Sequence, residues 1–121
     1  MYKMHDYFRF LADELTIEFI IRTRTGVKEF TDMPELSRHQ FYTRLAKARK
    51  LGLLYKTNGM YYLTSLGEMF LNNINYLREL EPVEWMLRSV DKINDPEIKS
   101  QLIHQLFNDR PDIEKCLTGP N

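Results

Sequence analysis

The sequence predicts a mainly helical fold with one small β-hairpin. Apolar residues recur at spacings of three and four along most of the chain, which is the helical pattern. Two short β-prone runs flank Asn58-Gly59, the strongest short-range signal for a hairpin. The 121 residues, 43% of them apolar, are enough to bury a core, and no apolar run approaches the roughly 18 residues of a membrane span.

The first predicted helix extends from Tyr7 to about Thr25. Its apolar stripe consists of Phe8, Leu11, Leu15, Phe19 and Ile20, widened by Ala12 and Ile21. Gly26 follows, with Arg22 and Arg24 before it, which is typical of a helix C-terminus. Residues 27–36 then predict a compact connector, anchored by Val27, Phe30, Met33 and Leu36.

A second helix is predicted from Arg38 to about Lys50. Ser37 and Gln40 have the spacing of a capping box at its start, and Leu51-Gly52-Leu53 ends it. The expected buried stripe is Phe41, Leu45, Ala48 and Gly52. At about 100° per residue, the opposite face carries His39, Thr43, Ala46 and Lys50, flanked by Gln40, Tyr42 and Lys47.

The predicted hairpin covers residues 53–63, with a type I′ turn at Asn58-Gly59. Because a lone hairpin is only marginally stable, we expect it to pack against the helices on either side. Ser65, with Glu68 three residues later, predicts a capped helix that continues to about Glu81.

The rest of the chain is predicted to be helical. Pro82 suits the first turn of a helix that contains Val83, Trp85, Met86, Leu87, Val90 and Ile93, and residues 94–96 break it. A further helix contains Ile98, Leu102, Ile103, Leu106 and Phe107, and one last turn is expected from Asp112 to Leu117. We therefore divide the chain into a domain of residues 1–81 and a helical extension of residues 82–121, which would serve in dimerisation or packing.

Charge is distributed unevenly, although 17 basic and 17 acidic residues give a net charge of zero. Residues 1–35 have a net charge of −2 and residues 68–121 a net charge of −4. Residues 36–67 contain no acid, and their six cations are Arg38, Arg44, Lys47, Arg49, Lys50 and Lys56. A merely solvated helix tends to alternate both signs, which stabilises it slightly. A segment without acids is more typical of a surface that meets a polyanion.

Two stretches of the sequence resemble a known class of regulators. They are Leu45-Ala46-Lys47-Ala48-Arg49-Lys50-Leu51-Gly52-Leu53-Leu54 and Tyr61-Tyr62-Leu63-Thr64-Ser65-Leu66-Gly67. With the order of elements over residues 7–80, they resemble the winged helix-turn-helix transcription regulators of prokaryotes and archaea, of the broad MarR, ArsR and PadR kind. The resemblance implies a recognition helix over residues 38–50, a wing over residues 53–63, and sequence-specific binding of double-stranded DNA in transcription regulation.

The physical properties of this segment agree with that resemblance, because an α-helix fits the major groove of B-DNA. Arg38, Arg44, Lys47 and Arg49 suit phosphate contacts, His39, Gln40 and Thr43 suit base edges, and Tyr42 suits either. Ser37, Lys50, Lys56 and Asn58 complete the predicted DNA-binding set.

Winged helices also serve as protein-interaction modules, which is the main alternative. A protein-docking helix would be expected to expose Leu, Met or Trp on its outward face, and apart from Tyr42 this one shows no large apolar residue there. Enzymatic activity is not expected, because His5, His39 and His104 are far apart and no catalytic or phosphate-binding motif occurs. No cofactor or metal is expected either.

The cellular setting and the oligomeric state are also predicted. The N-terminal residues lack the apolar centre of a signal peptide, and Cys116 is the only cysteine, so we expect a cytoplasmic protein without disulfides. The aromatic and methionine residues between 60 and 90 are expected to be core rather than a ligand pocket. The helices after Leu66 carry more apolar residues than a lone domain requires, which predicts a homodimer.

Overall fold

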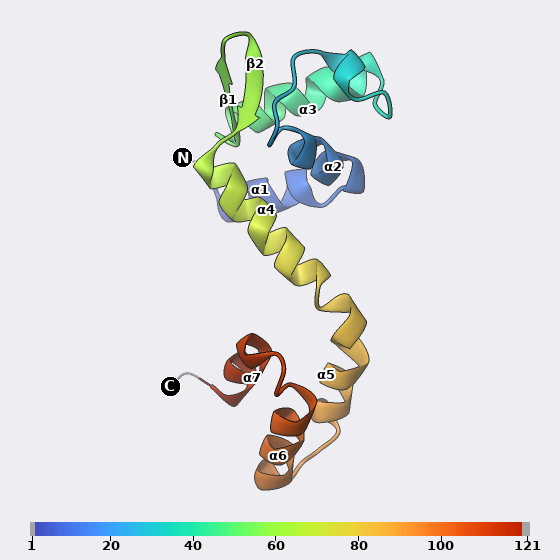
Figure 1. The fold of residues 1–121 in the computed structure, drawn as a ribbon, viewed down its shortest axis with the longest axis vertical. Helices are drawn as coiled ribbons and strands as arrows, with labels where there is room; N and C mark the ends of the chain where they lie inside the picture. The colour runs from blue at the N-terminus through green and yellow to red at the C-terminus, as the bar shows by residue number, and fades with distance from the viewer. Residues whose placement is uncertain (1, 120–121) are drawn as a thin grey trace. The chain divides into compact units, whose positions relative to one another are not determined.

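The computed structural model describes residues 2–119 and is mainly helical, with one two-stranded antiparallel sheet, as the sequence predicted (Figure 1). Its contacts divide the chain into two compact units, one ending at Tyr76 and the other beginning at Leu77. Between residues 2 and 119, no helix is both long and apolar enough to span a membrane.

The elements follow one another in a simple order along the chain. The N-terminal unit contains α1 (Met4–Leu11), α2 (Glu14–Arg22), the 3-10 helix η1 (Phe30–Asp32), α3 (Arg38–Lys50), β1 (Leu54–Thr57), β2 (Met60–Leu63) and most of α4 (Ser65–Arg78). The C-terminal unit contains the 3-10 helix η2 (Glu81–Val83), α5 (Glu84–Asp91), α6 (Pro96–Leu106) and α7 (Pro111–Thr118).

The prediction of a single helix from Tyr7 to Thr25 is wrong, because the helix is interrupted at Asp13 and two helices, α1 and α2, form instead. The Asp13 carboxylate caps α2, accepting the backbone N–H of Leu15 at 3.3 Å and the Thr16 hydroxyl at 3.0 Å. The break also disrupts the predicted apolar stripe. Phe8 is 59% exposed, whereas Tyr7 is buried in the core.

Helix α3 has the predicted bounds and the predicted capping box. The Ser37 hydroxyl accepts the Gln40 N–H at 3.1 Å, and the Gln40 side-chain oxygen accepts the Ser37 N–H at 2.9 Å. At the other end, the N–H groups of Gly52 and Leu53 bond back to the carbonyls of Arg49 and Ala48, in a Schellman motif with Gly52 at φ +78°. Gly52 is exposed rather than part of the buried stripe, because it lies beyond the last helical turn.

The predicted hairpin is also confirmed, with Leu54 opposite Leu63 and Thr57 opposite Met60. Asn58 and Gly59 have φ values of 51° and 77°, the positive values that a type I′ turn requires. Val27 forms an isolated bridge with Tyr61, through backbone bonds of 3.0 and 2.8 Å. The hairpin is therefore fastened to the segment that follows α2, as a marginally stable pair of strands requires.

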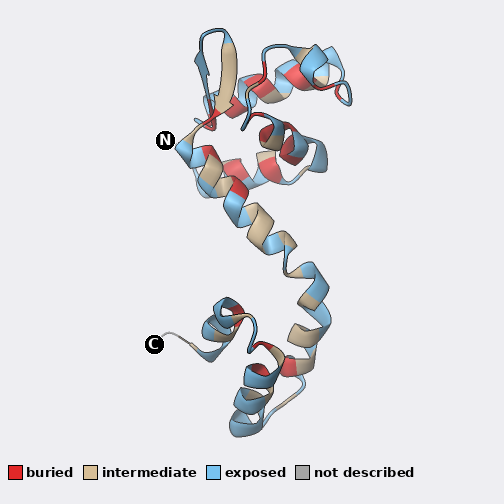
Figure 2. Ribbon diagram, viewed as in Figure 1, coloured by how far each residue is buried: buried red, intermediate tan, exposed pale blue. Residues whose placement is uncertain are grey.

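One core joins the helices of the N-terminal unit to the hairpin. Phe19 of α2 meets Phe41 of α3 edge-on at 5.6 Å between ring centroids, and Tyr7 of α1 stacks on Phe70 of α4 at 4.7 Å. Figure 2 shows the buried segments on the inner sides of these elements. The cap of α4 is Thr64, whose hydroxyl accepts the Gly67 N–H at 3.1 Å, and not Ser65 as predicted, because the Thr64 hydroxyl is also held by the Gly52 carbonyl at 2.8 Å.

The C-terminal unit has a smaller core, formed by Val90, Ile103, Phe107 and Ile113. Pro82 lies in η2, just before α5. The segment after Pro111 is an eight-residue helix rather than the single turn predicted. The expectation that the aromatic and methionine residues between 60 and 90 are core is wrong for Trp85, which is 60% exposed, and for Met69 of α4, which is 61% exposed.

Candidate nucleic-acid interface

Helix α3 buries one side in the core and leaves the opposite side free. Phe41, Leu45 and Ala48 are buried. The four residues predicted on the opposite face, His39, Thr43, Ala46 and Lys50, are all exposed. Within the described chain, no hydrogen bond or ion pair occupies the side chains of His39, Thr43 or Lys50. This face therefore presents unoccupied polar and cationic groups around one small residue.

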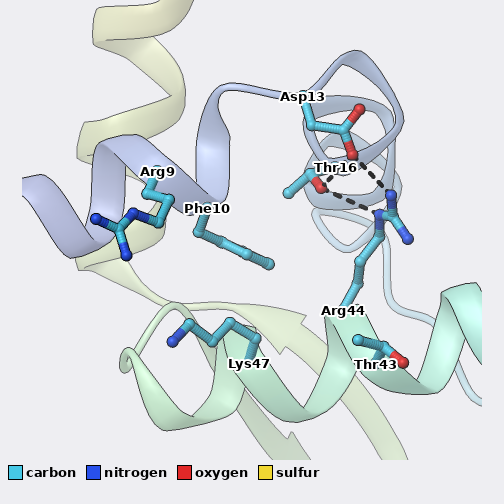
Figure 3. A pocket seen from close by; sticks show the side chains of 7 residues that line it. All are labelled: Arg9, Phe10, Asp13, Thr16, Thr43, Arg44 and Lys47. Atoms are coloured by element: carbon cyan, nitrogen blue, oxygen red, sulfur yellow. Dashed lines mark hydrogen bonds and ion pairs between the residues drawn. The ribbon is translucent and has the colours of Figure 1, made fainter.

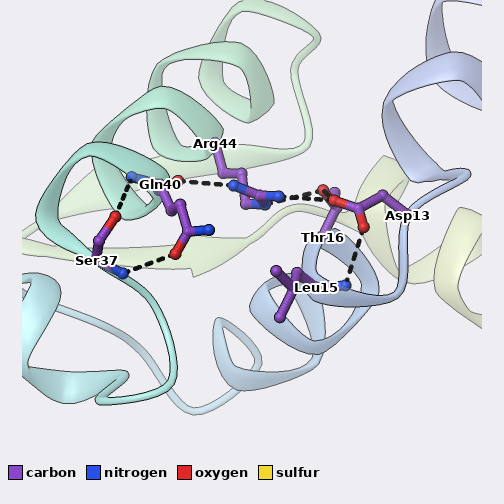
Figure 4. Close-up of polar contacts among 6 residues, drawn as sticks. All are labelled: Asp13, Leu15, Thr16, Ser37, Gln40 and Arg44. Atoms are coloured by element: carbon purple, nitrogen blue, oxygen red, sulfur yellow. Dashed lines mark hydrogen bonds and ion pairs between the residues drawn. The ribbon is translucent and has the colours of Figure 1, made fainter.

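One flank of α3 is fastened to α2 through Arg44 (Figure 4). The guanidinium donates to the Asp13 carboxylate at 2.7 Å, to the Thr16 hydroxyl at 3.0 Å and to the Gln40 carbonyl at 3.2 Å. Only 17% of the Arg44 side chain is exposed. Its three bonds are internal to the protein, so Arg44 fixes the orientation of α3 and has little left to offer a phosphate.

The same network determines the protonation of Asp13. The hydrogen bond from Arg44 is the main cause that holds the pKa of the Asp13 carboxyl below its usual value, and bonds from Thr16 and the Leu15 N–H lower it further against the opposing effect of burial. Asp13 is therefore ionised at neutral pH, and it neutralises Arg44.

On the other flank of α3, two arginines contact aromatic rings. The Arg38 guanidinium lies 4.7 Å from the centre of the Phe30 ring, and the Tyr42 ring lies 6.4 Å from the same ring. Near the end of α3, the Arg49 guanidinium lies 5.3 Å from the centre of the Tyr61 ring on the hairpin. These cation–π contacts hold both arginines in place while they keep their charge exposed to solvent.

The hairpin brings one more cation to this region. The Lys56 ammonium lies 5.5 Å from the Tyr61 ring that Arg49 also contacts, so a cation of the hairpin and a cation of α3 share one ring. Asn58 is exposed in the turn. The hairpin is thus positioned beside the C-terminal end of α3.

The capping box restricts two residues of the predicted DNA-binding set, of which Gln40 was expected to reach base edges. The Ser37 hydroxyl and the Gln40 side-chain oxygen are both used at the start of α3. The amide nitrogen of Gln40 remains as its free group, and this nitrogen is a donor only. Gln40 can therefore reach an acceptor on a base edge, whereas the usual bidentate pairing of glutamine with adenine is blocked.

An open hollow of about 320 Å³ lies between α3 and the helices α1 and α2 (Figure 3). It is lined by Arg9, Phe10, Asp13, Thr16, Thr43, Arg44 and Lys47. Four of these residues, Arg9, Phe10, Asp13 and Thr16, were not among the predicted site residues. The sequence could have predicted a helix start at Asp13, since aspartate is a preferred helix N-cap. No sequence pattern indicated Arg9.

The two units carry opposite charge. The N-terminal unit has eleven Lys and Arg against eight Asp and Glu, a net charge of +3, and the C-terminal unit has six against nine, a net charge of −3. The positive charge of the protein is therefore concentrated in the unit that contains α3.

Comparisons with known proteins give no significant match to any protein family, any curated sequence or any solved structure.

Proposed function

We propose that the N-terminal unit is a winged-helix domain that binds double-stranded DNA, with α3 in the major groove and the β1–β2 hairpin as the wing, in a protein that regulates transcription. The observation that carries the proposal is the outward face of α3, where the exposed side chains of His39, Thr43 and Lys50 have no hydrogen-bond or ion-pair partner among residues 2–119. No acid lies between residues 36 and 67 to neutralise them.

The roles of the individual residues follow from their contacts. The phosphate contacts of this proposal are two arginines held on aromatic rings, Arg38 and Arg49, and two exposed lysines, Lys47 and Lys50. His39 and Thr43, which lie at the centre of the outward face, are its base-reading residues, with Gln40 and Tyr42 beside them. Arg44 acts by positioning α3 rather than by touching DNA.

The test is fluorescence anisotropy with a labelled duplex of about 30 base pairs, about three helical turns. The native chain is titrated at several salt concentrations and compared with a Lys47→Glu/Lys50→Glu double variant. We expect the logarithm of the native affinity to fall linearly with the logarithm of the salt concentration, because bound cations on the DNA are released. The double variant should lose at least about tenfold in affinity, since two attractive contacts become repulsive.

A matched control is Lys92→Glu/Lys115→Glu, which makes the same change in charge at exposed positions of the C-terminal unit. It should retain nearly native affinity. Loss of affinity to the same extent in both double variants would show that only net charge matters. Absence of native binding at about 50 mM salt, where attraction to DNA is strong, would overturn the proposal and favour a winged-helix module that binds another protein.

A homodimer is part of the same proposal, since a two-fold dimer matches two half-sites on DNA. Exposed apolar residues on α1 and α4, namely Met4, Phe8, Leu66 and Met69, would supply apolar surface for its interface. Sedimentation at micromolar concentration tests this part, and a mass near 14.5 kDa would rule the dimer out.

A further inference from the structure

The hollow beside α3 has two cationic side chains that no acid neutralises. Arg9 reaches it from α1 and Lys47 from α3, and Figure 3 shows both charged ends on the same side of the hollow. Within the described residues, neither side chain makes a hydrogen bond or an ion pair. Both residues are exposed, and like charges that face one hollow repel each other.

The remaining charges of the hollow cancel. Arg44 is bonded to Asp13 at 2.7 Å, on the side of the hollow opposite to the free cations. Counting all four groups, the hollow keeps an excess of two positive charges. An anion placed between Arg9 and Lys47 would relieve their repulsion and gain two charge-assisted hydrogen bonds.

The other lining groups indicate which kind of anion fits. Arg9 and Lys47 supply N–H donors on one side of the hollow, and Figure 3 shows the Phe10 ring reaching between the two helices. A group with several acceptor oxygens and an apolar part next to them would use both features. A phosphodiester with its deoxyribose has that composition, and the volume of about 320 Å³ is at the small end of the range for ligand sites.

We propose that this hollow is a phosphate-binding subsite in which Arg9 and Lys47 contact one phosphate, and that its source is the backbone of the DNA on which α3 lies. The choice of source rests on the proposed function. Helix α1 then belongs to the DNA interface, although it lies outside the acid-free segment and before the region that resembles a recognition helix.

The experiment compares salt-dependent DNA binding of three single variants. Arg9→Gln removes one cation of the hollow, Lys3→Gln removes an exposed cation just before α1 that does not line the hollow, and Asp13→Asn removes the only acid in the hollow while it keeps a capping oxygen. Arg9→Gln should weaken binding several-fold and reduce the log–log salt slope by about 0.9, the value for one phosphate contact. Lys3→Gln should leave the slope unchanged, and Asp13→Asn should strengthen binding.

Opposite effects of Arg9→Gln and Asp13→Asn would support the subsite, because damage to the fold would weaken binding in both variants. If Arg9→Gln retains the native slope, or behaves like Lys3→Gln, the proposal is overturned. Circular dichroism of each variant verifies that the helices are intact.

A second measurement separates this proposal from the proposed function. Inorganic phosphate is titrated into the ¹⁵N-labelled full chain, and the backbone N–H signals of residues 9, 43 and 47 and the Arg9 Nε–H are followed by NMR. Saturable shifts that disappear in Arg9→Gln would support a phosphate site even if the native chain fails to bind DNA, in which case the DNA backbone is excluded as the source. Absence of such shifts together with absence of DNA binding would overturn both proposals.

Discussion

The unit that ends at Tyr76 and the unit that begins at Leu77 differ in charge and in the size of their cores. The first has a net charge of +3 and a core cluster that extends from Tyr7 to Leu71 and joins all of its helices and strands. The second has a net charge of −3 and a cluster of four buried residues. The net positive charge and most of the buried apolar residues are therefore found in the same unit.

This difference indicates that the two units contribute unequally to the stability of the protein and to its proposed function. A unit of about 45 residues buries a smaller fraction of its surface than a larger domain does, so its stability is marginal without help from elsewhere. Exposed apolar side chains, such as Trp85 and Ile98, add little to its core. We therefore expect the proposed DNA binding to depend on the core of the N-terminal unit, and to survive damage to the C-terminal unit.

The largest expected effects come from Phe41→Ala and Phe107→Ala, which remove one fully buried ring from each unit. Each should cost about 3–5 kcal/mol, because the transfer free energy of the ring is lost and a cavity remains. Phe41→Ala should abolish DNA binding. Phe107→Ala should unfold the C-terminal unit, and NMR signals of the N-terminal unit and its DNA affinity should persist.

Phe107→Ala also tests whether the two units unfold independently. If Phe107→Ala eliminates the NMR signals of both units together, the units unfold as one cooperative body and the division of stability is wrong. Thermal unfolding followed by circular dichroism should then show a single transition in both variants.

The features that the sequence predicted correctly have local determinants. The capping box of Ser37 and Gln40, the Asn58-Gly59 turn and the stop at Gly52 each depend on residues a few positions apart, and the structure contains all three. The outward face of α3 was predicted for the same reason, since it follows from the helical period alone.

The features that the sequence did not predict depend on residues that are far apart in the chain. Asp13 interrupts the first helix partly because its carboxylate binds Arg44, which is 31 positions away. Thr64 replaces Ser65 as the cap of α4 because its hydroxyl also meets the carbonyl of Gly52. The hollow at Arg9 is likewise formed by residues from three helices, and helical periodicity contains no information about which helices pack together.

An intermediate effect is expected for Gly67→Ala, which tests how closely the core of the N-terminal unit is packed. Gly67 is buried in the first turn of α4, and a Cβ atom there would lie 2.8 Å from the carbonyl oxygen of Leu53 and collide with the Leu63 side chain. Since a backbone oxygen cannot move away freely, we expect a loss of about 1–3 kcal/mol in the free energy of unfolding, measured with urea. Ser65→Ala, at an exposed position of the same helix, is the control. Equal stability of the two variants would show that the packing around Gly67 adapts easily.

The smallest expected effect concerns an ion pair in each unit. In the N-terminal unit, Asp13→Asn keeps the cap of α2 but leaves Arg44, 17% exposed, without its counter-ion. The folded-state pKa of Asp13 is lowered, so the pair stabilises the protein above the ordinary pKa of the carboxyl, and this stabilisation is lost as the pH falls through the lower folded value. Because 47% of the Asp13 side chain is exposed, solvent screens the pair, and we expect the variant to lose only about 1 kcal/mol at neutral pH.

Glu84→Gln is the matched change in the C-terminal unit, where Glu84 and Arg88 form a pair with both side chains more than half exposed. It should change stability by at most about 0.5 kcal/mol. Urea unfolding at neutral pH and at about pH 2.5 measures both variants, and the deficit of Asp13→Asn should shrink at the lower pH, which lies below the ordinary pKa of the carboxyl. A deficit that stays the same at both pH values would mean that Asp13 acts through the geometry of its hydrogen bonds to Arg44 and Thr16 and not through its charge. Arg44 would then position α3 without the help of an ion pair.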